Sequence, residues 1–242
     1  MLTALAHCRA VPLHCGHRPP LLERSATLTQ VKICGLTNLM DAETALAAGA
    51  DMLGFICYPK SRRYITVEQI AAILDGLRRS DGACRTVGVF VDAPLESVQA
   101  VLDQSGLDLA QLHGGEPPVM LERLGGRGFK ALRPHSLAEA EADAEWYTGL
   151  GPADGPDLLI DAYHPTAYGG TGLRADWQIA ATVARSHRLM LAGGLTPANV
   201  SAAIAAVRPW GVDVSSGVET RPGQKDHDAM RAFIAAVKEE DR

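Results

Sequence analysis

The sequence predicts an α/β chain folded as one (β/α)8 barrel, and three observations support this prediction. From residue 30 onward, short apolar segments rich in Val, Ile and Leu alternate with segments of helical periodicity. The apolar segments are nearly continuous, as expected of parallel strands that are buried on both faces. Eight strand–helix pairs in 242 residues, with no linker between them, fit a compact, single-domain TIM barrel. An open doubly wound sheet is the alternative, but that fold gives no reason for the regular strand spacing.

Eight apolar segments are expected to form the strands of this barrel. In chain order they are residues 31–34, 51–57, 85–91, 109–113, 129–133, 157–161, 188–192 and 211–215. The carboxyl ends of these strands, with the loops that follow them, should form the active face.

Helix start signals lie between the strands. Thr66 and Gln69 have the spacing of a capping box, which predicts a helix that begins after Thr66. Thr196 is the expected N-cap of another helix, with Pro197 at its first position. The last helix should begin at Asp226 and face the core with Met230, Phe233 and Val237.

The composition argues against several classes of partner. The net charge of -5 does not favour a nucleic-acid partner, since such proteins usually present a basic face. No apolar run approaches the roughly 18 residues of a membrane span. The five cysteines are odd in number and scattered, which is typical of reduced thiols in a cytoplasmic protein. The sequence leaves open whether the chain is a monomer or a homodimer.

Residues 1–29 differ from the rest of the chain. They lack periodicity and the continuous apolar core of a signal peptide, so we expect a disordered extension ahead of a barrel domain at 30–242. An upstream start codon is the other explanation for this segment. A metal site is disfavoured because no standard ligand spacing connects His7, Cys8, His14, Cys15 and His17.

Glycine-rich turns follow the last two strands. Gly193 and Gly194 separate a strand from a helix, and Ser215, Ser216 and Gly217 follow the next strand. Backbone amides approach an anion closely at glycine, and the loops after strands 7 and 8 are the usual phosphate position of this fold. The turns therefore predict a phosphate site. The segment "GGTG" is interpreted as a mobile lid with hinges at Gly169, Gly170 and Gly172.

Several stretches together resemble the successive signatures of the phosphoribosylanthranilate isomerases. They are "KICGLTN", "GADMLGFICYPKSRRYI", "VGVFVD", "QLHGGE", "LLIDAY", "YGGTG", "LAGGLTPANV" and "VDVSSGVETRPGQKDHD". The resemblance runs in family order from residue 31 to about residue 238. One departure is Cys57, which stands where an aromatic residue is more usual and should affect packing more than chemistry.

The resemblance implies an Amadori rearrangement in tryptophan biosynthesis, from N-(5-phosphoribosyl)anthranilate to 1-(2-carboxyphenylamino)-1-deoxyribulose 5-phosphate. Such a reaction opens the furanose ring and removes a proton from C2 of the sugar. It needs one acid and one base but no cofactor or metal.

The resemblance assigns Cys34 as the general base and Asp161 as the general acid. Strands 6, 7, 8 and 1 are neighbours in a closed barrel, so the two groups would flank the predicted phosphate site. A thiol must have a lowered pKa to act as a base near neutrality, and Lys32 lies on the same strand face as Cys34.

The resemblance also assigns substrate contacts. Arg63 would bind the anthranilate carboxylate, for which a guanidinium fork is suited, whereas Arg62 is expected to be solvated. His113 and Asp213 would line the ribose pocket. An unpaired carboxylate inside a strand is costly to bury, so Asp213 needs either a role in the site or a buried partner.

Two other interpretations of the function remain, namely another sugar-phosphate barrel enzyme and a non-catalytic barrel. Among such enzymes, an indole-glycerol-phosphate synthase would need a catalytic lysine and a longer N-terminal helical segment. A ribulose-phosphate epimerase would need His and Asp metal ligands on several strand ends. Neither set is evident. A non-catalytic phosphate-binding barrel is disfavoured because Cys34 and Asp161 are both present.

Overall fold

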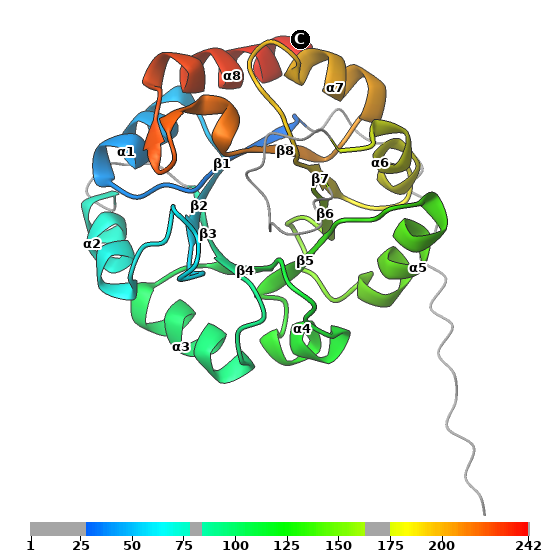
Figure 1. Ribbon diagram of the computed structural model, residues 1–242, viewed down its shortest axis with the longest axis horizontal. Helices are drawn as coiled ribbons and strands as arrows, with labels where there is room; N and C mark the ends of the chain where they lie inside the picture. The colour runs from blue at the N-terminus through cyan, green and yellow to red at the C-terminus, as the bar shows by residue number, and fades with distance from the viewer. Residues whose placement is uncertain (1–27, 78–83, 163–174, 242) are drawn as a thin grey trace, which may run out of the picture.

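Eight parallel strands close into a barrel that is surrounded by helices (Figure 1). The structure, a computed structural model, describes residues 28–77, 84–162 and 175–241. Each strand pairs with the next along the chain, and β8 pairs with β1 to close the ring. The strands are β1 (Gln30–Cys34), β2 (Met52–Ile56), β3 (Arg85–Phe90), β4 (Leu109–Leu112), β5 (Gly128–Leu132), β6 (Leu158–Ile160), β7 (Leu189–Leu191) and β8 (Gly211–Val214).

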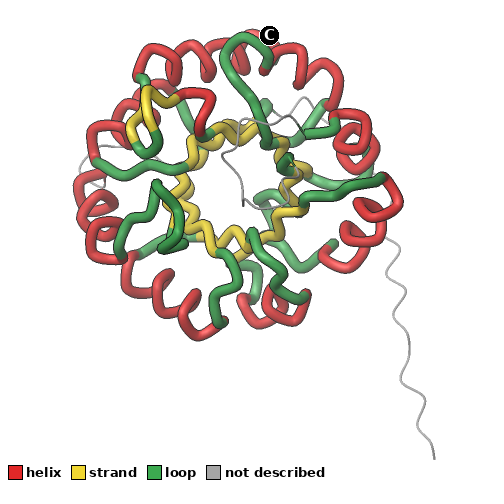
Figure 2. Tube along the Cα trace, viewed as in Figure 1, coloured by secondary structure: helices red, strands yellow, loops and turns green. Residues whose placement is uncertain are grey.

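The predicted TIM barrel is confirmed, and every expected strand is present within one or two residues. Helices follow the strands and form an outer ring (Figure 2). They are α1 (Leu39–Ala48), α2 (Val67–Leu77), α3 (Leu95–Ser105), α4 (Pro118–Leu124), α5 (Leu137–Tyr147), α6 (Trp177–Ala184), α7 (Val200–Val207) and α8 (His227–Glu240).

Two of the three predicted helix starts are confirmed. Thr66 and Gln69 form the capping box, in which each backbone N–H donates to the other side chain. The Asp226 carboxylate caps α8, whose Met230, Phe233 and Val237 are buried.

The predicted start of α7 is wrong by one turn. Residues 197–199 form a turn, and the regular helix begins at Val200 with Asn199 as its N-cap. The Asn199 side chain accepts from the Thr196 N–H at 2.8 Å and donates to the Gly194 carbonyl at 2.9 Å. These two bonds fold the segment back toward the end of β7, so a turn precedes the helix.

Two apolar cores support the barrel. One lies between the strands and the helices, and the smaller one fills the barrel interior with residues such as Phe129, Leu159 and Met190. Above this interior core, toward the carboxyl ends of the strands, the buried residues become polar. They include Lys32, Gln111, His113, Asp161 and Asp213.

A small hairpin that the sequence did not predict lies between β8 and α8 (Figure 1, orange). It comprises the 3-10 turn η1 (Ser216–Val218) and the antiparallel strands β9 (Glu219–Arg221) and β10 (Gln224–Lys225). Among the described helices, none is long and apolar enough to cross a membrane.

Candidate active site

One pocket at the carboxyl ends of the strands holds every predicted site residue that the structure describes. It has about 790 Å³ of space not filled by protein atoms, part of which is open to solvent. The predicted residues in its wall are Cys34, Arg63, His113, Asp161, Gly193, Gly194, Asp213, Ser215, Ser216 and Gly217. The proposed lid glycines Gly169, Gly170 and Gly172 lie outside the described residues, as does the segment 1–27.

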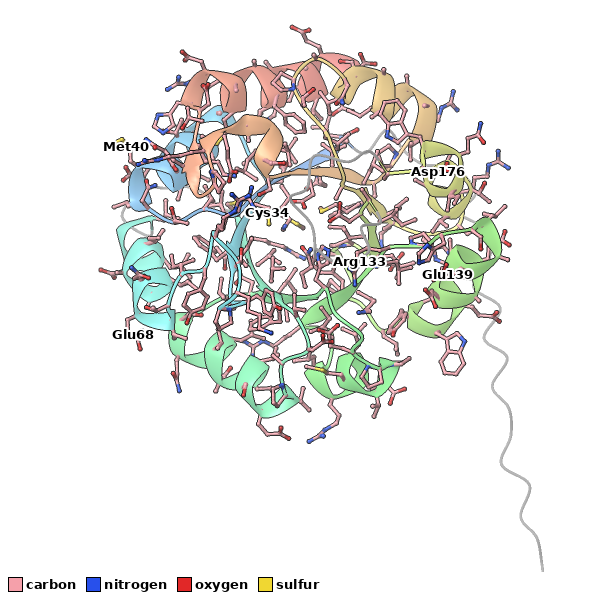
Figure 3. All side chains as sticks on the ribbon, in the orientation of Figure 1. Cys34, Met40, Glu68, Arg133, Glu139 and Asp176 are labelled. Atoms are coloured by element: carbon pink, nitrogen blue, oxygen red, sulfur yellow. The ribbon has the colours of Figure 1, made fainter. Side chains whose placement is uncertain are left out.

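Cys34 ends β1 on the inner side of the barrel (Figure 3). It pairs with Gly54 of β2, where a Cβ atom would lie 2.9 Å from the Cys34 Sγ and 3.0 Å from the Lys32 Nζ. Gly54 therefore leaves the room that the thiol and the ammonium occupy. Burial raises the pKa of Cys34, and the nearby charge of Lys32 offsets only part of this effect.

Lys32 and Asp213 form a buried ion pair beneath the thiol. The Lys32 Nζ lies 2.9 Å from Asp213 Oδ1, and the lysine is fully buried. Burial alone would lower the pKa of Lys32, but the charges of Asp213 and Cys34 outweigh it and raise that pKa to about 12. Asp213 thus has the buried partner that its position in a strand required, although it also lines the pocket.

Asp161 and His113 face each other across the pocket. Asp161 follows β6, and its Oδ1 accepts from the Ala162 N–H at 2.7 Å. Its Oδ2 lies 3.3 Å from His113 Nε2, a contact that lacks the alignment of a hydrogen bond. Both polar groups can therefore turn toward a ligand without losing an internal hydrogen bond between them.

Gln111 contacts the ring nitrogen of His113 that faces away from Asp161, a partner that was not predicted from the sequence. The Gln111 Nε2 lies 2.8 Å from His113 Nδ1. An amide nitrogen donates, so Nδ1 accepts, and the proton of the neutral ring is on Nε2. Gln111 lies on β4 and His113 directly follows that strand, so the two side chains are two positions apart and face the same side, which was the available signal.

Arg63 is buried and held by an acidic partner from the hairpin. It is 7% exposed, whereas Arg62 beside it is exposed, as expected. The Arg63 Nε lies 2.9 Å from Glu219 Oε1, and its Nη2 lies 2.7 Å from Glu219 Oε2. Glu219 thus occupies the Nε and Nη2 donors of the guanidinium, and the Nη1 donors are left for a ligand. Glu219 was not identified as a site residue from the sequence.

The loops after β7 and β8 meet at the predicted phosphate position. Gly193 has a φ of 87°, and a Cβ there would lie 2.7 Å from the Ala162 N. At Gly217, a Cβ would collide with the Leu195 carbonyl oxygen, so only glycine permits this approach. The buried Ser215 hydroxyl has no hydrogen-bond partner among the described residues, which leaves it for a ligand.

Cys57, the departure from the family pattern, lies outside the pocket wall and packs against the outer core. Burial raises the pKa of its thiol to about 12. No group of three or more His, Cys, Asp or Glu side chains in the described part of the chain is arranged to hold a metal ion.

Comparisons with known proteins point to one family. Residues 31–236 match the family described as N-(5'phosphoribosyl)anthranilate (PRA) isomerase. A curated N-(5'-phosphoribosyl)anthranilate isomerase of Pelobacter propionicus is 44% identical over 212 residues, which is 88% of this chain and 97% of that protein.

Two solved structures are also similar. Monomers of the dimeric phosphoribosylanthranilate isomerase of Thermotoga maritima superpose with a TM-score of 0.75 at 37% identity, covering 88% of this chain and 100% of that chain. A phosphoribosyl anthranilate isomerase in complex with reduced 1-(o-carboxyphenylamino)-1-deoxyribulose 5-phosphate has a TM-score of 0.74 at 36% identity, with the same coverage of 88% and 100%.

Proposed function

The chain belongs to the N-(5'-phosphoribosyl)anthranilate isomerase family, and from this premise we propose how its pocket carries out the reaction. It is an isomerase of tryptophan biosynthesis. Its reaction converts N-(5-phosphoribosyl)anthranilate into 1-(2-carboxyphenylamino)-1-deoxyribulose 5-phosphate. The observation that carries the assignment of roles is the placement of one thiol and one carboxylate on either side of the glycine-rich loops.

The loops after β7 and β8 bind the substrate phosphate. Gly193, Gly194, Ser216 and Gly217 bring backbone close to the pocket, and the Ser215 hydroxyl provides a further donor. With its phosphate fixed there, the ribose extends between β6 and β1. An anchored sugar presents its reacting atoms at a fixed distance from both catalytic groups.

Asp161 acts as the general acid. It donates a proton to the furanose ring oxygen while the bond from that oxygen to C1 breaks. The electron pair of the anilino nitrogen then forms a double bond to C1, which leaves an open-chain iminium. His113 contacts the carboxyl oxygen of Asp161 that is not bound to the Ala162 N–H, and so orients it toward the sugar.

Cys34 acts as the general base. Its thiolate takes the proton from C2, and the C2–H electron pair forms a C1=C2 double bond as the iminium becomes neutral. The resulting enolamine gains a proton at C1 and loses one from the C2 hydroxyl, which gives the ketone. The Lys32 ammonium stabilises the thiolate, since among the neighbouring charges it lowers the pKa of that thiol most.

Arg63 binds the carboxylate of the anthranilate ring through the end of its guanidinium. Asp213 holds Lys32 in place beneath the thiol. We also propose a cytoplasmic enzyme, in accord with the free cysteines of the described residues, that works as a monomer or a homodimer. A dimer is suggested by the relative of Thermotoga maritima.

The acid and base roles are tested by Cys34→Ala and Asp161→Asn. Each variant should lower kcat by about 10²–10⁴-fold, because a positioned acid or base contributes that much. Affinity for reduced 1-(o-carboxyphenylamino)-1-deoxyribulose 5-phosphate should change little. Turnover is followed by the loss of the anthranilate-type fluorescence of freshly prepared substrate.

Cys57→Ala is the matched control, since it removes another thiol, which is partly buried and does not line the pocket. It should retain near-normal turnover. A near-normal kcat in Cys34→Ala would assign the thiol to packing, and Asp213 would be the next base to examine.

A further inference from the structure

The ammonium of Lys225, at the end of the hairpin, connects three parts of the pocket. Its Nζ donates to the Cys34 carbonyl at 2.6 Å, to the Ser215 carbonyl at 3.0 Å and to Glu219 Oε1 at 3.0 Å. The side chain is fully buried, and the three acceptors use all three of its donors. Lys225 therefore ties the end of β1, the end of β8 and the partner of Arg63 to one point.

Glu219 lies between two cations. Its side chain is 3% exposed and accepts from both Arg63 and Lys225. Burial would raise the pKa of Glu219, but hydrogen bonds and charges from Arg63 and Lys225 lower it below its usual range. The cluster thus holds one negative and two positive charges, and its net positive charge still attracts an anion.

The hairpin that carries Glu219 and Lys225 is itself fastened to the segment after β1. Thr37 Oγ1 donates to the Gly223 carbonyl at 2.6 Å. The Lys225 backbone N–H donates to Asp41 Oδ2 of α1 at 3.0 Å. Because both ends are anchored, Glu219 has a fixed place from which to hold the Arg63 side chain.

We propose that Glu219, held by Lys225, is a positioning residue that sets the Arg63 guanidinium for the substrate carboxylate and so determines preference for anthranilate-bearing ligands. An unrestrained arginine side chain loses rotamer entropy when it binds a ligand, and that loss weakens binding. Glu219 binds the Nε and Nη2 groups of the Arg63 guanidinium in the absence of any ligand. This inference rests on the proposed role of Arg63.

The test compares two probes that differ only in the carboxyl group. One is reduced 1-(o-carboxyphenylamino)-1-deoxyribulose 5-phosphate, and the other carries an unsubstituted phenylamino group. Glu219→Gln, which keeps the size and removes the charge, should weaken binding of the first probe about tenfold or more, the scale of one hydrogen bond to a charged group. Binding of the second probe should not change. Equal or tighter binding of the carboxylated probe would overturn the proposal.

A double-mutant cycle separates this inference from the assignment on which it rests. In an Arg63→Ala background, Glu219→Gln should cause no further loss of selectivity between the probes. If Arg63→Ala alone retains full selectivity, the role of Arg63 is wrong and the inference fails with it. If Arg63→Ala loses selectivity and Glu219→Gln does not, only the inference fails.

Asp157→Asn is the matched control for stability. Asp157 is also 3% exposed and paired with an arginine, Arg188, but it lies at the opposite end of the barrel, just before β6. The Asp157→Asn variant should have a lower melting temperature and an unchanged selectivity between the probes.

If Glu219→Gln fails to fold, Glu219→Asp is the second variant, since it retains the charge with a shorter side chain. It should reduce the selectivity between the probes. Full selectivity in that variant would overturn the proposal.

Discussion

Cys34 lies beside two opposite charges that act on its thiol in opposite directions. Lys32 favours the thiolate, whereas Asp213 and the loss of solvent disfavour it. Burial is the largest effect, so the pKa of the free enzyme's thiol is above its ordinary value. The thiol is therefore mostly protonated at neutral pH, and its basic fraction grows as the pH rises.

The pH dependence of kcat/KM should show this balance. In the unaltered enzyme kcat/KM should rise from neutral pH toward the raised pKa of Cys34. Lys32→Met removes the stabilising cation, so the rising limb should move to higher pH. Asp213→Asn removes a carboxylate that opposes ionisation, so the limb should move to lower pH. Profiles of kcat/KM, together with ultraviolet titration of the thiolate, measure both shifts.

Either single variant leaves one buried charge unpaired, which destabilises a protein by about 3–5 kcal/mol. The double variant Lys32→Met/Asp213→Asn removes both charges and controls for this loss. Shifts of the limb in the same direction for both single variants would contradict the opposed action of the two charges.

The sequence identified the groups at the pocket better than their partners. Cys34, Asp161 and Arg63 stand next to recognisable strand ends or motifs. The pairing of Glu219 with Arg63 and that of Lys32 with Asp213 instead depend on which residues face each other across elements far apart in the chain. Lys32 is the direct partner of Asp213 in the pairing of β1 with β8. The register of two strands cannot be read from the sequence alone, so this ion pair could not be predicted.

At the scale of elements, the proposed phosphate site depends on contact between two loops rather than on either loop alone. Gly217, after β8, approaches the carbonyl of Leu195, after β7. Asn199 holds the loop after β7 in a turn before α7 begins. The Thr-Pro pair at 196–197 is a common local start signal for a helix. It misplaced the start because the tertiary approach of Gly217 and the Asn199 bonds decide the path of the chain.

Gly217→Ala should therefore separate the two loops. The added Cβ meets a backbone carbonyl that cannot rotate away, so the loops must move apart. A misplacement of about 1 Å costs about 100-fold in catalysis, and we expect kcat/KM to fall by that order. Affinity for inorganic phosphate, measured by calorimetry, should fall as well.

Gly126→Ala is the control for general destabilisation. Gly126 has a φ of 85°, and nothing lies within 4 Å of its Cβ position. Its backbone strain should lower the free energy of unfolding by about 1–2 kcal/mol with unchanged phosphate affinity. Normal phosphate affinity in Gly217→Ala would show that contact between the loops is not required.

At the scale of the whole molecule, closure of the barrel brings the proposed acid and the proposed base to one pocket. Asp161 after β6 and Cys34 on β1 are far apart in the chain, and only the pairing of β8 with β1 makes them neighbours around β7 and β8. The strands were predictable because each is a short apolar run buried on both faces. Closure followed from their number, because eight parallel strands of this size commonly form a ring.

Hydrogen bonds between Thr29 and Asp241 join the start of the barrel domain to the end of its last helix. The Thr29 N–H and Oγ1 each donate to the Asp241 carboxylate at 2.9 Å, so Thr29 connects the chain before β1 with the end of α8. Among the described residues, none before Cys34 lines the pocket. We therefore predict that a chain starting at Leu28, after an initiator Met, keeps the kcat and melting temperature of the full chain.

A chain starting at Gln30 should keep its kcat but lose about 1–2 kcal/mol of unfolding free energy, because both hydrogen bonds to a charged group disappear. Denaturant titration of the two truncated chains measures this difference. Asp241→Asn in the full chain should show a smaller loss of the same kind, and in the chain from Gln30 it should show none, since its partner is gone. An equal loss in both truncated chains would place the stabilising contact before Leu28. A fall in kcat with either would mean that the segment before β1 contributes to the active face.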